Sequence, residues 1–179
     1  MNNALMFSSA TDEWETPQAF FDRYDVEFGF ALDLAANRKN AKCAGYFGPN
    51  GLEEDGLTGD IRRALQAVED GTQRRAIWCN PPYSRGAQKL FIARAAQLRR
   101  EGFTVVMLLP ARTDTKAFHT HIYDASKWAP REGIEIRFIP GRLKFGGAVN
   151  SAPFPSMIVI FRSKVGGRSS WEERDEEPA

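Results

Sequence analysis

The chain has 179 residues, of which 42% are hydrophobic, and a formal net charge of +1. This length can close one hydrophobic core without disulfides. No apolar run approaches the roughly 18 residues of a membrane span and no basic-then-apolar leader opens the chain, so we expect a cytoplasmic protein with no membrane contact. The cysteines and histidines (Cys43, Cys79, His119 and His121) are too few and too poorly spaced for a zinc site, so we expect no metal.

The first predicted elements are a helix and a strand. Thr16 as N-cap and Pro17 at the first helical position predict a helix that runs to about Tyr24. Residues 28–34 alternate between large apolar and other residues, which predicts a strand with Asp33 near its carboxyl end. Asp33 would then lie at the edge where open α/β sheets bind ligands.

The rest of the body alternates between helices and strands. Residues 35–59 are mostly loop, with room for one short strand at 44–47, and Asp60 precedes an amphipathic helix that ends near Gly71. Further along, we predict a strand at 76–79, a helix at 88–101, a strand at 103–109, a helix at 113–123 capped by Thr113 or Asp114, and strands at 134–139 and 157–161. The alternation predicts an α/β fold with a mostly parallel, twisted sheet and flanking helices.

Both ends of the chain differ in composition from the body. Residues 1–12 are small and polar and predict a flexible arm, whereas residues 163–179 predict a disordered acidic tail. The remaining residues, 13–162, contain no internal linker and predict a single domain.

The segment Asn80-Pro81-Pro82-Tyr83 follows the short apolar run at 76–79. The two prolines fix their φ angles and lack N–H donors, so the carbonyls of this turn remain free to accept hydrogen bonds. Asn80 adds an acceptor oxygen and Tyr83 adds a flat ring. This set fits an exocyclic amino group on a planar ring, such as that of adenine. The alternative is a strand-ending turn without chemistry, because these dipeptides are common in loops.

Basic residues follow two of the predicted strands. Arg112 comes after the strand at 103–109, and Arg142 and Lys144 lie beside Phe145 in a glycine-bounded loop. This mixture suits contact with phosphates next to a stacking residue. The alternative is that Leu143 and Phe145 belong to a small strand and that the basic residues form its solvated face.

Taken in order, these blocks resemble the phage and prophage-type DNA N-6 adenine methyltransferases, the Dam-like class. The resemblance runs from about Trp14 to Phe161. It implies a seven-stranded, Rossmann-like fold that binds S-adenosylmethionine, located in a host cytoplasm if the protein is phage-encoded. The blocks that carry it are residues 14–17, 31–36, 55–60, 80–83, 109–115 and 141–145.

The resemblance also implies contacts with S-adenosylmethionine. Asp33 would accept hydrogen bonds from the methionine ammonium and Asp60 from the adenine amine, although these residues could instead bond their own turn and cap the following helix. No glycine-rich turn follows Asp33, and no acidic residue is clearly placed for the ribose hydroxyls. The predicted cofactor-binding residues are Trp14, Thr16, Pro17, Asp33, Ala35 and Asp60.

The implied reaction is methyl transfer to the amino group of an adenine flipped out of double-stranded DNA. Asn80 and Pro81 would accept the two amino hydrogens, Pro82 would stiffen the turn, and Tyr83 would stack on the base. Arg112, Arg142, Lys144 and Phe145 would contact the DNA. Two alternatives remain: an amino-methyltransferase acting on RNA or a protein glutamine, and a DNA-binding protein without catalytic activity. The oligomeric state stays open.

Overall fold

A computed structural model describes residues 14–68, 75–146, 148 and 150–163. The main sheet consists of β1 (Phe30–Asp33), β2 (Gly45–Tyr46), β3 (Ala76–Cys79), β4 (Val105–Pro110), β7 (Ile134–Phe138) and β8 (Ser156–Phe161). A separate hairpin pairs β5 (Tyr123–Asp124) with β6 (Ala129–Pro130). The helices are α1 (Gln18–Phe28), α2 (Ile61–Ala67), α3 (Arg85–Arg100) and α4 (Lys116–His121).

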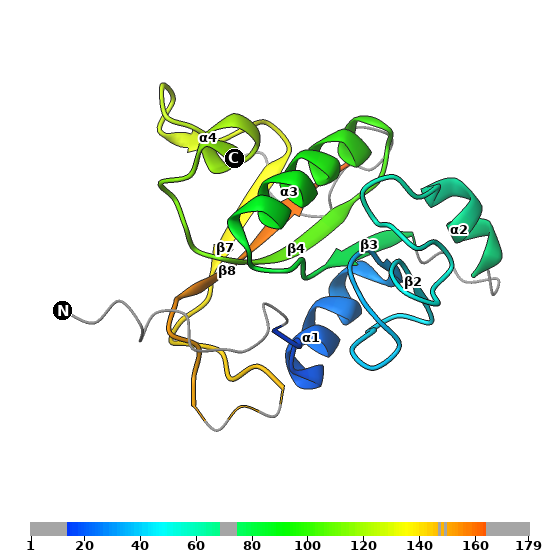
Figure 1. The fold of residues 1–179 in the computed structure, drawn as a ribbon. Coiled ribbons are helices and arrows are strands. Elements are labelled where there is room, and N and C mark those ends of the chain that lie inside the picture. The colour runs from blue at the N-terminus through cyan, green and yellow to red at the C-terminus, as the bar shows by residue number, and fades with distance from the viewer. Residues whose placement is uncertain (1–13, 69–74, 147, 149, 164–179) are drawn as a thin grey trace, which may run out of the picture.

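The strand order in the sheet is β2-β1-β3-β4-β8-β7 (Figure 1). The first four strands in this order are parallel, and β8 runs antiparallel to both of its neighbours. This confirms the mostly parallel sheet that the sequence predicts, and the mixed sheet observed is compatible with a Rossmann-like methyltransferase fold. The described residues form six strands in this sheet rather than the seven that the resemblance implies.

Helices cover both faces of the sheet. Alternate residues of β3 point to opposite sides, so that Ile77 and Cys79 pack with residues of α2, α3 and α4, whereas Trp78 packs with α1. Every residue of β4 and β8 is buried, as expected for strands covered on both faces. Figure 1 shows α1 and α3 on opposite sides of these strands.

Several helix ends differ from the sequence predictions. Pro17 rather than Thr16 is the N-cap of α1, and the helix continues past Tyr24 to Phe28, where Gly29 ends it in the left-handed region with φ 63°. Because α1 is longer, β1 begins at Phe30.

The start of α3 is also earlier than predicted, at Arg85 rather than Gln88, because the Ser84 hydroxyl accepts from the Ala87 N–H at 3.3 Å. Thr115, not Thr113 or Asp114, caps α4. Serine and threonine recur near each of these ends, so the tertiary path of the chain decides which residue serves as the cap.

Some sequence predictions lie outside the described residues. These are the arm at 1–12 and the tail beyond Ser163, so the division into an arm, a single domain over 13–162 and a tail stays a prediction. The helix predicted to end near Gly71 ends at Ala67, with Val68 as its C-cap. None of the helices in the described ranges is long and apolar enough to cross a membrane.

Candidate active site

A cavity of about 270 Å³ lies where the carboxyl ends of β1 and β3 meet the segment that precedes α1. Parallel α/β sheets bind their ligands at this edge. Seven of the residues predicted from the sequence line it: Trp14, Thr16, Asp33, Ala35, Asn80, Pro81 and Pro82. The cavity therefore joins residues predicted to hold the cofactor to residues predicted to hold the amine.

Asp33 is a buried carboxyl group in the wall of this cavity. It accepts hydrogen bonds from the backbone N–H groups of Ala35 at 3.3 Å and Lys42 at 3.1 Å. Burial raises the pKa of Asp33 to about 6, although both N–H groups and the Lys42 charge act in the opposite direction. The turn-bonding alternative is thus present in the structure, and the buried acid also favours a cation in the cavity.

The two ends of the Asn80 side-chain amide have different surroundings. Its Nδ2 donates to the backbone carbonyl of Trp14. Its Oδ1 is buried and accepts no hydrogen bond from the described residues. Because only the NH₂ end of an amide can donate to a carbonyl, the contact with Trp14 fixes which end stays free. The free end is an acceptor, and it belongs to a residue that lines the cavity.

Tyr83 lies in a group of four rings that we call the aromatic cluster: Trp14, Tyr83, Phe145 and Phe154. The Tyr83 side chain is only 4% exposed, and its hydroxyl has no partner among the described residues. Burial raises the pKa of the Tyr83 phenol well above its usual value. Tyr83 does not line the cavity, although the three residues before it do.

The residues predicted to contact DNA take different positions. Arg112 Nη1 donates to the Tyr83 carbonyl at 3.3 Å, and Arg142 Nη1 donates to the Ala152 carbonyl at 3.4 Å. Lys144 is exposed, whereas Phe145 is buried in the aromatic cluster. The small strand of the alternative is absent, because residues 142–145 have no strand pairing. Its solvated basic face is present, since Arg142 and Lys144 are exposed.

Two predicted cofactor residues lie outside the cavity. Asp60 is exposed, and its carboxylate caps α2 by accepting from the Arg63 N–H at 3.1 Å. Pro17 is the N-cap of α1 and does not line the cavity. The capping alternative weighed for Asp60 is therefore the interaction that the structure contains.

Several cavity residues are absent from the sequence prediction. Trp78 lines the cavity, and its buried Nε1 donates to no acceptor among the described residues. Glu54 supplies a carboxylate, and Lys42 pairs with Glu15 at 3.2 Å across the rim. Trp78 and Asn80 are two residues apart at the end of β3, so their side chains point to the same face of the sheet. This spacing is a sequence signal that could have identified Trp78 as a neighbour of the site. Phe154 in the aromatic cluster had no such signal, because it lies in an irregular loop.

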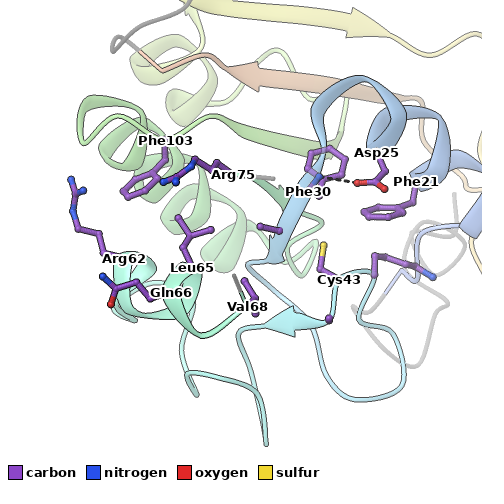
Figure 2. Close-up of a pocket in the computed structure, with 13 residues that line it drawn as sticks. Phe21, Asp25, Phe30, Cys43, Arg62, Leu65, Gln66, Val68, Arg75 and Phe103 are labelled. Atoms are coloured by element: carbon purple, nitrogen blue, oxygen red, sulfur yellow. Dashed lines mark hydrogen bonds between the residues drawn. The ribbon is translucent and has the colours of Figure 1, made fainter. Parts of the chain in front are cut away.

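A larger cavity, of about 650 Å³, lies at the opposite ends of the same strands (Figure 2). Its walls include Phe30 at the start of β1, Arg75 just before β3, and Arg62 and Gln66 of α2. Among the described residues, Lys42 is the one that lines both cavities. We place the candidate site in the smaller cavity, because that cavity lies at the carboxyl edge and contains the Asn80 turn.

The described residues include no group of three or more histidine, cysteine, aspartate or glutamate side chains that could hold a metal ion. The polar groups of the smaller cavity instead suit an organic ligand that carries both positive charge and hydrogen-bond acceptors. Asp33 and Glu54 are acidic, and Trp78 offers a donor.

Comparisons with known proteins identify the family. A model of the family described as DNA N-6-adenine-methyltransferase (Dam) matches residues 4–177. Among curated proteins, "Putative methyltransferase YfdM" of Escherichia coli (strain K12) is 36% identical over 73 residues, which cover 40% of this chain and 71% of that protein. No solved structure matches the chain. Because the family model spans nearly the whole sequence, the chain belongs to the DNA N-6-adenine-methyltransferase (Dam) family.

Proposed function

We propose that this methyltransferase transfers a methyl group from S-adenosylmethionine to the exocyclic amino group of an adenine flipped out of double-stranded DNA. The observation that carries the proposal is the buried, unpartnered Oδ1 of Asn80, a residue that lines the cavity. A buried acceptor without a donor is costly, and a ligand N–H removes that cost. Family membership supports methyl transfer as the reaction.

The residues of the turn act by positioning. Asn80 Oδ1 and the Pro81 carbonyl accept the two hydrogens of the adenine amine, which draws the nitrogen lone pair out of conjugation and directs it at the methyl carbon. The sulfonium of the bound donor supplies a methyl group that is already activated. The reaction forms a carbon–nitrogen bond and breaks a carbon–sulfur bond, the electron pair stays on sulfur, and the amine proton leaves to solvent.

The cavity residues can be matched to the parts of S-adenosylmethionine. Asp33 attracts the ammonium, while Thr16 and the free Trp78 Nε1 donate to the carboxylate. Glu54 accepts from the ribose hydroxyls, a role for which the sequence offered no clear candidate. Asp60 has no part in this assignment, because it caps α2 outside the cavity. The volume of about 270 Å³ is near the lower end of ligand pockets, roughly 300–1,000 Å³.

DNA approaches along the loop that contains Arg142 and Lys144. Both side chains are exposed next to the aromatic cluster, so they can reach phosphates while the target base enters beside Tyr83. Arg112 serves a different purpose in this proposal, because its guanidinium binds the Tyr83 carbonyl and holds the turn in place.

The test uses tritiated S-adenosylmethionine with plasmid DNA, ribosomal RNA and total cell protein as separate acceptors. We expect label in DNA, recovered as N6-methyladenine after digestion. Label in RNA or in protein glutamine instead would assign the chain to one of those substrate classes. Absence of any label, together with no calorimetric heat on adding S-adenosylmethionine, would leave only a non-catalytic DNA-binding role.

A further inference from the structure

The stacking surface proposed for the target base is covered by a side chain of the protein itself. The Trp14 ring stacks on Tyr83 with the ring centroids 6.4 Å apart and an angle of 23° between the ring planes. Phe145 and Phe154 contact both rings at steeper angles. These neighbours leave Tyr83 only 4% exposed, so a purine has no open face of Tyr83 on which to stack.

A base cannot enter between the two rings as they stand. A third ring needs about 7 Å between the planes that enclose it, twice the contact distance of about 3.5 Å between carbon atoms. The distance between the planes of Trp14 and Tyr83 cannot much exceed their centroid distance of 6.4 Å. Entry of a base therefore requires that Trp14 move.

Trp14 also contacts the side-chain amide of Asn80, which is proposed to accept a hydrogen bond from the adenine amine. Its backbone carbonyl accepts from Asn80 Nδ2, so one residue covers the stacking surface and holds the other end of the catalytic amide. The next residue ties the segment to the loop opposite, because the Glu15 carbonyl accepts from the Gly146 N–H at 2.8 Å. The Glu15 carboxylate also pairs with Lys42 at 3.2 Å, and Trp14 itself is half-buried. These backbone and ion-pair contacts all join residues outside the helices and strands, so they can break without disturbing the sheet.

We infer that Trp14 is a stand-in for the target base. In the DNA-free protein the Trp14 ring covers Tyr83, and the flipped adenine displaces this ring when it enters. The inference rests on the proposed function. An indole and a purine are both flat two-ring systems, so one stacked ring replaces another on Tyr83. Only a base that stacks and hydrogen-bonds better than Trp14 completes the exchange, which makes Trp14 a determinant of specificity.

The test compares the wild-type protein with Trp14→Ala on a duplex that carries 2-aminopurine in place of the target adenine, whose position methylation-sensitive sequencing of the methylated plasmid provides. Trp14→Ala should bind this duplex about two- to tenfold more tightly, because the base no longer competes with an aromatic pair. It should also give the stronger 2-aminopurine fluorescence, which reports an unstacked, flipped base. Trp128→Ala is the matched control, since Trp128 is 84% exposed and lies outside both the cavity lining and the aromatic cluster.

The smaller substitution Trp14→Phe keeps the test decisive if circular dichroism shows that Trp14→Ala is unfolded. It should shift affinity and fluorescence in the same direction by a smaller amount, because a phenyl ring overlaps Tyr83 less. Equal or weaker duplex binding by both variants would overturn the stand-in role and leave the proposed function intact. Failure of the wild-type protein and the variants alike to bind any duplex would overturn the proposed function, and this inference with it.

Discussion

At the scale of single residues, the site contains buried polar groups that have no hydrogen-bond partner among the described residues. Asn80 Oδ1, Trp78 Nε1 and the Tyr83 hydroxyl are all buried without a hydrogen-bond partner among the described residues. A buried polar group without a partner carries a desolvation cost, which a ligand that pairs with it removes. Two of the three belong to cavity residues, and the third lies in the adjoining aromatic cluster.

Asp33 makes cofactor binding depend on pH. Because its pKa is raised to about 6, Asp33 carries a proton in the free protein below that pH, and a cationic ligand must expel the proton to bind. We expect the dissociation constant for S-adenosylmethionine to rise by up to about tenfold per pH unit below about pH 6. Calorimetry from about pH 7 to about pH 5 measures this, and Asp33→Asn should bind weakly with little pH dependence. An unchanged wild-type affinity over that range would exclude Asp33 as the ammonium partner.

Substitutions at Arg112 and Lys144 distinguish a residue that positions the turn from a residue that contacts DNA. Arg112→Ala should lower kcat about tenfold, because a charged hydrogen bond to the Tyr83 carbonyl is lost, while the salt dependence of DNA binding stays the same. Lys144→Ala should lower the slope of log affinity against log salt by about one and leave kcat unchanged. The two variants are measured by steady-state kinetics and by salt titration. A reduced salt slope in Arg112→Ala would return Arg112 to the DNA-contacting role expected from the sequence.

At the scale of the elements, the close approach of one loop to β1 shapes the cavity. Gly56 lies in the cavity wall, and a Cβ at this position would lie 2.0 Å from the Leu34 carbonyl oxygen. Only glycine allows the loop to pass so close to the end of the strand. The same loop carries Glu54, so its position determines where that carboxylate meets the cavity.

Gly56→Ala should therefore weaken S-adenosylmethionine binding and lower the free energy of unfolding by about 1–3 kcal/mol, because loop and strand must separate. Gly86→Ala is the matched control, since a Cβ there meets no atom within 4 Å and the residue lies in α3. The control should be stabilised by as much as about 1 kcal/mol through helix propensity. Urea unfolding and calorimetry measure both variants. Equal affinity in Gly56→Ala and the wild type would show that this contact does not shape the cavity.

The sequence predicts elements better where local chemistry determines them. The strands β3, β4 and β8 agree with their predictions because each is an apolar run bounded by glycine, proline or polar residues. The aromatic cluster could not be predicted in the same way. Phe154 lies between two prolines in a loop without periodicity, and it meets Tyr83 only through the folding of distant segments.

At the scale of the whole molecule, the sheet brings the candidate site together. The parallel pairing of β1 with β3 and of β3 with β4 puts Asp33, Asn80 and Arg112 at one edge, because each follows or ends a strand with the same direction. The alternation of elements predicts this much. It does not predict that β8 inserts antiparallel between β4 and β7, since strand order depends on contacts between distant parts of the chain.

Asp33 also links the stability of the molecule to pH. Its pKa is higher in the folded chain, about 6, than its ordinary value of 3.8, so the folded state binds the proton more tightly and stability rises as the pH falls through about 6. From about pH 7 to about pH 5, Asp33 should add about 1 kcal/mol to the free energy of unfolding. Asp33→Asn should lack this contribution and should be at least as stable as the wild type at neutral pH. Urea titrations at both pH values test the difference between the two proteins, and an identical pH response in both would contradict it.

The role assigned to Asn80 is tested most directly by measuring cofactor binding and methyl transfer in the same variant. Asn80→Ala should bind S-adenosylmethionine with an affinity close to that of the wild type, because Asp33, Thr16 and Trp78 remain. Its transfer of tritiated methyl groups to DNA should fall by about 10²-fold or more, since the acceptor that positions the amine is lost. Transfer by Asn80→Ala at the wild-type rate would contradict the role of Asn80 in holding the target amine.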